Sequence, residues 1–153
     1  MSEKPARGPS FPPVYVIVAL MAMGAFHVGF PIARFLPAPY HYAGVVVMAL
    51  GLALMLWGAL HFRRARTAIV PFQPVSALVT SGPYRYTRNP MYLGMAGFLL
   101  GAALYLGTVT PFIVLPAFVG LIQERFILAE EAMLEEAFGR RYLDYKSSVH
   151  RWL

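Results

Sequence analysis

Apolar residues are grouped into long runs that end at clusters of charged residues. The longest uncharged run covers residues 89–123, with arginines before it and a glutamate-rich segment after it. A membrane core is about 30 Å thick and a helix needs roughly 20 apolar residues to cross it, so this run is too long for one upright span and sufficient for two short ones. Gly107, Thr108 and Pro111 mark the expected break. The polar segments at the two ends of the run are therefore expected on the same side of the membrane.

Two earlier apolar runs, at about 14–33 and 40–62, predict a helical hairpin that precedes this pair. Gly44, Gly51 and Gly58 recur at a constant spacing on the second run, and such a stripe of small residues lets a neighbouring helix approach closely. The sequence therefore predicts an all-α, polytopic membrane helix bundle of about four transmembrane helices, of which the last two form a short hairpin.

The fourth span has no strong stop signal at its polar end. The helix is expected to continue past Glu124 as a cytoplasmic C-terminal extension that Gly139 ends, since glycine accepts the left-handed conformation found after helices. The extension is followed by amphipathic side chains suited to a membrane interface, namely Tyr142, Tyr145, Val149 and Trp152.

Composition agrees with a membrane protein, because 58% of the 153 residues are hydrophobic and only 13% are charged. The length predicts a single domain, 1–153, made of the N-terminal hairpin at 14–62 and a core at 63–153. The chain has no cysteine, which excludes disulfides and thiolate nucleophiles, and its four histidines do not have the spacing of metal ligands. No metal site is expected.

The formal net charge of +6 would suggest nucleic-acid binding in a soluble protein. In a membrane protein the positive-inside rule accounts for it, and no nucleic-acid partner is expected. Of the 13 lysines and arginines, all but Arg34 fall on one face of a four-span arrangement, including Lys4 and Arg7 before the first span. Both termini are therefore predicted to be cytoplasmic.

Arg88-Asn89-Pro90-Met91-Tyr92 is the first segment with chemical potential. The residue before a proline avoids the helical region, proline suits the first helical position, and asparagine is a strong N-cap, so the third span is predicted to begin here. Its first amides, with Arg88 beside them, would suit a carboxylate or phosphate. The alternative is that Asn89 only caps the helix and Arg88 only follows the positive-inside rule.

The glutamates of the fourth helix form the second such segment. On a regular helix Glu124, Glu131 and Glu135 fall on one exposed polar stripe, whereas Glu130 projects from the apolar stripe. A buried carboxylate needs a donor, which here is an arginine, a backbone nest, or the ammonium or hydroxyls of a ligand. The alternative is a purely structural pair with a loop arginine, or a place among lipid headgroups.

Two segments of the chain carry a specific joint pattern. They are Leu78-Val79-Thr80-Ser81-Gly82-Pro83-Tyr84-Arg85-Tyr86-Thr87-Arg88-Asn89-Pro90-Met91-Tyr92-Leu93-Gly94 and Glu130-Glu131-Ala132-Met133-Leu134-Glu135-Glu136-Ala137-Phe138-Gly139-Arg140-Arg141-Tyr142-Leu143-Asp144-Tyr145. Taken together, they resemble the isoprenylcysteine carboxyl methyltransferase and phospholipid methyltransferase superfamily. The resemblance covers about residues 63–153. It implies a polytopic enzyme in which the last helices and the cytoplasmic segments enclose S-adenosylmethionine, while a lipophilic acceptor enters from the bilayer. Membrane lipids are the other expected partners.

The resemblance also implies which positions line the cofactor pocket. The family often has histidine where this chain has Asn89, and asparagine cannot gain a proton near neutral pH, so a mechanism that relies on an imidazole there does not transfer to this chain. The implied cofactor-binding residues are Val79, Gly82, Tyr84, Arg88, Asn89, Pro90, Tyr92, Leu93, Glu130 and Glu131.

Roles for these residues follow from the chemistry of methyl transfer from a sulfonium. The amides at Asn89–Tyr92 with Arg88 are predicted to hold the cofactor's carboxylate, and Glu130 or Glu131 its ammonium or ribose. Aromatic faces attract cations, so Tyr84 and Tyr92 are predicted to pack on the adenine or near the sulfonium methyl.

Acceptor chemistry leaves several functions open. A carboxylate acceptor needs no base and benefits from a cation such as Arg125, and the shortage of suitably placed histidines favours it. With the resemblance, this gives carboxyl O-methylation of isoprenylcysteine type as the first expectation. Glu131 could instead act as the base for phospholipid headgroup N-methylation, or for methylation of a small thiol or amine. The non-enzymatic alternative is a four-span scaffold whose basic face binds anionic lipid.

Overall fold

The computed structural model describes residues 11–65 and 76–153 and shows helices joined by short connections in this part of the chain. Lys4 and Arg7, which entered the topology prediction, lie outside the described residues. The elements in chain order are α1 (Pro12–Gly29), η1 (Tyr40–Tyr42), α2 (Ala43–Arg64), η2 (Gly82–Arg85), α3 (Pro90–Leu106), η3 (Thr110–Ile113), α4 (Val114–Ile122), η4 (Gln123–Ile127), α5 (Leu128–Phe138) and α6 (Arg140–Ser148).

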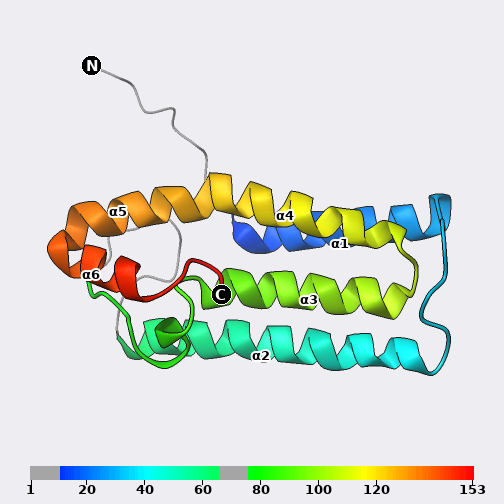
Figure 1. The fold of residues 1–153 in the computed structure, drawn as a ribbon, viewed down its shortest axis with the longest axis horizontal. Helices are drawn as coiled ribbons and strands as arrows, with labels where there is room; N and C mark the ends of the chain where they lie inside the picture. The colour runs from blue at the N-terminus through cyan, green and yellow to red at the C-terminus, as the bar shows by residue number, and fades with distance from the viewer. Residues whose placement is uncertain (1–10, 66–75) are drawn as a thin grey trace, which may run out of the picture.

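The long helices lie roughly parallel to one another in an elongated bundle (Figure 1). Helix α3 packs against α2 on one side and against α1 and α4 on the other, and α6 folds back against α5 (Figure 1). Within the described residues three helices are long and apolar enough to cross a membrane, at Pro12–Gly29, Tyr40–Arg64 and Thr110–Phe138, and α3 is a shorter apolar helix. The protein is thus an all-helical integral membrane protein.

The first helix ends earlier than the hydrophobic pattern predicts. Helix α1 stops at Gly29, whereas the apolar run continues to about residue 33. Phe30 leaves the helical conformation with φ −140° and ψ 62°, because Pro31 follows it and disfavours the helical region for the preceding residue. The prediction of a span to residue 33 is therefore wrong by one helical turn.

Helices α2 and α3 touch backbone to backbone along the predicted glycine stripe. Gly44, Gly51 and Gly58 are all buried. A Cβ atom on Gly51 would lie 2.6 Å from the carbonyl oxygen of Gly94 on α3, a distance that no side chain tolerates. The stripe is therefore the packing surface that holds these two helices together, as the spacing predicts.

The break after α3 lies where the sequence places it. Gly107 has φ +70°, a left-handed conformation that glycine adopts without strain, and the next helical turn begins at Thr110. Thr108 is fully buried, and its Oγ1 lies 2.8 Å from Nδ1 of His27 on α1. This contact ties the turn to the first helix.

The last long helix contains a π-helical turn, η4, at Gln123–Ile127. Such a turn takes up one extra residue, so α5 is rotated relative to a regular continuation of α4. Glu124 is exposed, but Glu131 is only 6% exposed. The prediction that Glu131 lies on an exposed stripe is therefore wrong, because the extra residue moves it onto the face that a regular helix gives to Glu130. Gly139, at φ +51°, ends α5 as predicted.

Candidate cofactor site

The polar ends of α3 and α5 meet at one end of the bundle, as the sequence predicts. They enclose a cavity of about 70 Å³. The cavity is lined by Phe62, Ala77, Leu78, Val79, Tyr84, Arg88, Asn89, Met91, Tyr92, Glu130, Glu131, Leu134, Tyr142 and Tyr145.

Arg88 brings a buried positive charge to this cavity. Its side chain is 9% exposed, and its Nη2 lies 3.3 Å from Oε1 of Glu131. Its Nε and Nη1 are buried without a well-formed hydrogen bond among the described residues, and the hydroxyl of Tyr142 lies close to the guanidinium. A buried guanidinium N–H group that has no hydrogen-bond partner lowers the stability of the folded protein. The residue therefore has two donors that suit an anionic group entering the cavity.

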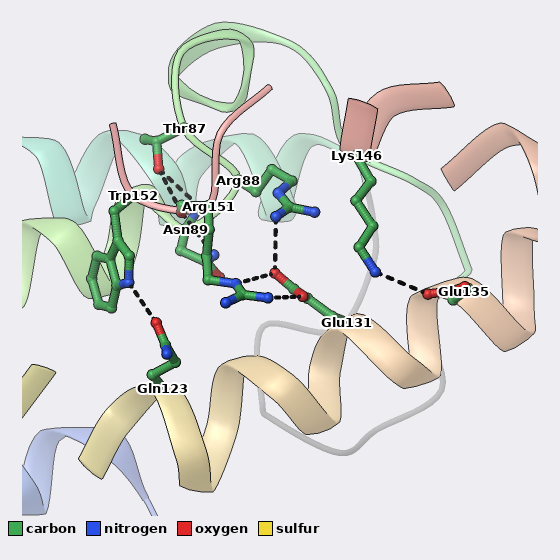
Figure 2. A network of polar contacts seen from close by, with 9 residues as sticks. All are labelled: Thr87, Arg88, Asn89, Gln123, Glu131, Glu135, Lys146, Arg151 and Trp152. Carbon is green, nitrogen blue, oxygen red and sulfur yellow. Dashed lines mark hydrogen bonds and ion pairs between the residues drawn. The ribbon is translucent and has the colours of Figure 1, made fainter. Parts of the chain in front are cut away.

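Glu131 is paired with two arginines. In addition to Arg88, it accepts hydrogen bonds from Nε and Nη2 of Arg151, each at 2.8 Å (Figure 2). This fork geometry is the strongest form of an arginine–carboxylate contact. The hydrogen bonds to Glu131 raise the pKa of Arg151 above its ordinary value. Both oxygens of Glu131 are thus occupied, and the three charged groups together carry a net charge of +1 (Arg88 +1, Arg151 +1, Glu131 −1).

Glu130 has a different partner. Its Oε1 accepts a hydrogen bond from the hydroxyl of Tyr92 at 2.7 Å, and Tyr92 is 5% exposed. The donor is a neutral phenol, so the negative charge of Glu130 is solvated by a hydrogen bond without being neutralised by a cation. The predicted need of Glu130 for a donor is met by Tyr92, and the carboxylate keeps further acceptor capacity toward the cavity.

Three further tyrosines surround the cavity as neutral donors. Tyr84 is buried, its hydroxyl has no partner among the described residues, and burial raises the pKa of this phenol above its ordinary value. The hydroxyl of Tyr145 donates to the carbonyl oxygen of Tyr84 at 2.6 Å. Burial also raises the pKa of Tyr142 to about 12. These phenols therefore stay protonated at neutral pH.

Asn89 does not cap α3 with its side chain, in contrast to the prediction. Its Nδ2 donates 3.0 Å to the carbonyl oxygen of Arg151, and its own amide donates to Oγ1 of Thr87 (Figure 2). The amide of Asn89 is therefore not free for a ligand, which corrects the predicted set of amides. The next two amides, of Met91 and Tyr92, lie in the first turn, where a helix provides no acceptor.

Some of the predicted site residues do not line the cavity. Arg125 is exposed on the π turn, on a different face from Glu131. Gly82, at φ +61°, packs against the ring of His61, where a Cβ atom would clash. Pro90 and Leu93 lie in the first turn of α3 but are not among the lining residues. The structure thus brings Val79, Tyr84, Arg88, Asn89, Tyr92, Glu130 and Glu131 together.

Helix α6 and the segment after it contribute contacts that the sequence reasoning missed. Tyr142 is buried, so its assignment to a membrane interface is wrong, and the half-buried Tyr145 donates a hydrogen bond to the carbonyl oxygen of Tyr84. Trp152 donates through Nε1 to Oε1 of Gln123 at 3.0 Å (Figure 2). The signal that could have revealed this docking is the amphipathic pattern of α6, whose tyrosines recur on one face beyond the glycine turn.

Comparison with known proteins gives this geometry a family. The family model described as "Phospholipid methyltransferase" matches residues 39–141, well over half of the chain. The chain belongs to the phospholipid methyltransferase family. Membership places it among the membrane methyltransferases, and methyltransferases of this kind use S-adenosylmethionine.

Two individual relatives give further support. A solved structure of the eukaryotic intramembrane Ras methyltransferase ICMT (isoprenylcysteine carboxyl methyltransferase) matches with a TM-score of 0.68 and 23% identity. The match covers 100% of this chain and 53% of ICMT, so this chain spans about half the length of that protein and shares its membrane fold. An uncharacterized protein of Haemophilus influenzae is 38% identical over 63 residues, which are 41% of this chain and 100% of the relative.

Proposed function

We propose that this chain transfers a methyl group from S-adenosylmethionine to a lipophilic acceptor in the membrane. The observation that carries the proposal is the pair of unpartnered donors of Arg88, which are buried in a cavity that also holds the carboxylate of Glu130. Their charges match those of an amino-acid group, because Arg88 suits a carboxylate and Glu130 suits an ammonium. Family membership supplies the reaction class.

The lining residues have distinct roles in this proposal. Arg88, with the free amides of Met91 and Tyr92, holds the carboxylate of the cofactor. Glu130 accepts hydrogen bonds from its ammonium or ribose, and the hydroxyl of Tyr84 supplies a neutral donor. Val79 and the aromatic faces exclude water. When bound, S-adenosylmethionine supplies a methyl group that its sulfonium charge has already activated, so the protein contributes position and electrostatics.

A carboxylate is the acceptor that the residues of the cavity support best. A carboxylate is already charged, so no residue has to remove a proton from it. Glu131, the base considered for an amine, accepts hydrogen bonds from Arg151 at both of its oxygens. The exposed Arg125 is not proposed as the cation for the acceptor. We therefore favour carboxyl O-methylation of isoprenylcysteine type.

Headgroup N-methylation of a phospholipid is the second candidate. Two observations favour it: the matching family model is that of phospholipid methyltransferases, and Glu130 lies at the cavity with a neutral partner. A carboxylate whose hydrogen-bond partner is a neutral phenol can accept a proton from an amine.

A labelling experiment separates the two acceptors. The purified protein in nanodiscs is incubated with S-adenosylmethionine that carries a tritiated methyl group and with membrane lipid extract, N-acetyl-S-farnesylcysteine or phosphatidylethanolamine. A methyl ester releases labelled methanol in base, whereas an N-methyl group does not. Base-labile product on the farnesylcysteine probe is expected. Base-stable product on phosphatidylethanolamine would support the second candidate.

The variant Arg88→Gln serves as the control for the site in the same assay. Its incorporation is expected to fall at least tenfold, since a hydrogen bond to a charged group contributes roughly 1.5–3 kcal/mol. Failure of the unmodified protein to bind S-adenosylmethionine at saturating concentrations, measured by its melting temperature, would contradict the proposed function itself.

A further inference from the structure

Arg151 lies on a short segment after α6 that is fastened to the start of α3. The amide of Arg88 donates to the carbonyl oxygen of His150 at 2.9 Å. The carbonyl oxygen of Arg151 accepts from Oγ1 of Thr87 at 3.1 Å and from Nδ2 of Asn89 at 3.0 Å (Figure 2). The backbone of Arg151 is therefore fixed, and its side chain is aimed at Glu131 on α5.

The contacts of Glu131 are divided unequally between its two arginines. Arg151 makes two hydrogen bonds of 2.8 Å to it, whereas Arg88 makes one contact of 3.3 Å through Nη2 (Figure 2). Arg151 is also the more accessible of the two arginines, with 31% of its side chain exposed against 9% for Arg88. Arg151 therefore supplies most of the neutralisation of Glu131, and Arg88 keeps its buried charge.

Without Arg151, Oε2 of Glu131 would lose its hydrogen bond, and Oε1 would keep the contact of 3.3 Å with Nη2 of Arg88. A buried carboxylate and a buried guanidinium reach their strongest contact as a bidentate pair. Arg88 would then add one of its unpartnered donors, Nε or Nη1, to the contact of Nη2 with Glu131 and turn that donor away from the cavity. The resulting pair would be neutral and would not attract an anion.

We propose that Arg151 is a positioning residue of the cofactor site, which occupies Glu131 so that the free donors of Arg88 point at the carboxylate of the bound cofactor. This inference rests on the proposed function, because the cofactor supplies the carboxylate. Arg151 itself acts through Glu131 and Arg88.

The test compares two ligands that differ in the amino-acid group. S-Adenosylhomocysteine carries the carboxylate, and 5′-methylthioadenosine has the same nucleoside without it. Isothermal titration of Arg151→Gln in nanodiscs is expected to show affinity for S-adenosylhomocysteine lowered roughly tenfold or more, with affinity for methylthioadenosine unchanged. A general loss of structure would lower both affinities equally, and that result would overturn the inference. So would an unchanged affinity for S-adenosylhomocysteine.

The matched control is Arg140→Gln, the same substitution at a side chain that is 91% exposed. It is expected to leave both affinities unchanged. A loss of affinity for S-adenosylhomocysteine alone in Arg140→Gln equal to that in Arg151→Gln would overturn the inference, because it would show an unspecific effect of positive charge.

A double variant tests the mechanism directly and does not depend on the stability of the single variant. In Glu131→Gln/Arg151→Gln the carboxylate that would capture Arg88 is absent, so affinity for S-adenosylhomocysteine is expected to recover relative to Arg151→Gln. If the double variant binds as weakly as Arg151→Gln, or more weakly, the inference is wrong. Absence of binding to the unmodified protein is a separate outcome, which contradicts the proposed function.

Discussion

Two adjacent carboxylates on α5 have different partners. Glu131 lies between two guanidinium groups, whereas Glu130 receives one hydrogen bond from the neutral Tyr92. The charge of Glu131 is therefore compensated within the protein, and that of Glu130 is left for a cationic ligand group. We therefore propose Glu130, and not Glu131, as the residue that receives the ammonium or ribose of the cofactor.

The substitution Glu130→Gln tests this role at the residue scale. The amide oxygen can still accept from Tyr92, so the melting temperature without ligand is expected to stay within a few degrees of the original. Affinity for S-adenosylmethionine is expected to fall roughly tenfold, as one charge-assisted hydrogen bond is lost. Isothermal titration measures the affinity and scanning calorimetry the melting.

Glu136→Gln is the control for this substitution, since Glu136 is exposed on the same helix. It removes the same charge from the chain without touching the cavity, and binding is expected to stay as it was. If Glu130→Gln bound S-adenosylmethionine as tightly as Glu136→Gln, Glu130 would not contact the ligand.

At the scale of elements, the π turn η4 decides which glutamates face the cavity. It lies where two consecutive apolar residues, Phe126 and Ile127, are both fully buried. The residues that follow are rotated by the extra position, and Glu131 reaches Arg88 and Arg151 as a result. Such turns are found frequently at functional sites.

Deleting one residue from this turn and inserting one into it are expected to have opposite effects on cofactor binding. Deletion of the exposed Glu124 lets the turn become a regular helix, while α5 keeps the face that it presents to the cavity. Affinity for S-adenosylhomocysteine is expected to remain within about threefold. Insertion of one alanine after Glu124 rotates α5 by about 100° and is expected to abolish binding.

Titration of both variants with S-adenosylhomocysteine in nanodiscs checks this pair of outcomes, with circular dichroism as a measure of helix content. Loss of binding on deletion together with normal binding on insertion would show that the π turn does not set the register of α5.

For the whole molecule, the sequence predicts the bundle better than it predicts the site. Long apolar runs and the Gly107 break are local signals, and both are found in the structure. The register of α5 was not predictable, because the π turn depends on how Phe126 and Ile127 pack against other helices. The docking of Arg151 was missed for a similar reason: the pairing joins distant segments, and neither residue differs locally from an exposed charge.

The orientation of the bundle in the membrane is still a prediction from charge. Arg63 and Arg64 at the end of α2 lie at the same end of the bundle as the candidate cofactor site. Arg34 lies at the opposite end, where its backbone forms an antiparallel bridge with that of Thr108. Because cations concentrate in cytoplasmic segments, the site is expected to face the cytoplasm. S-Adenosylmethionine is a charged, water-soluble molecule, so a site at the cytoplasmic end receives it without membrane crossing.

Cysteine labelling tests this orientation on a clean background, because the chain contains no cysteine. Tyr40→Cys introduces a thiol at the end of the bundle opposite the site, at a residue that is 68% exposed. Asp144→Cys introduces a thiol near the site, at a side chain that is 74% exposed. A membrane-impermeant maleimide added to intact cells is expected to label the first variant. The second should react only after the membrane is permeabilised. The reverse pattern would place the cofactor site outside the cytoplasm, away from the supply of its ligand, and would contradict both the orientation and the proposed reaction.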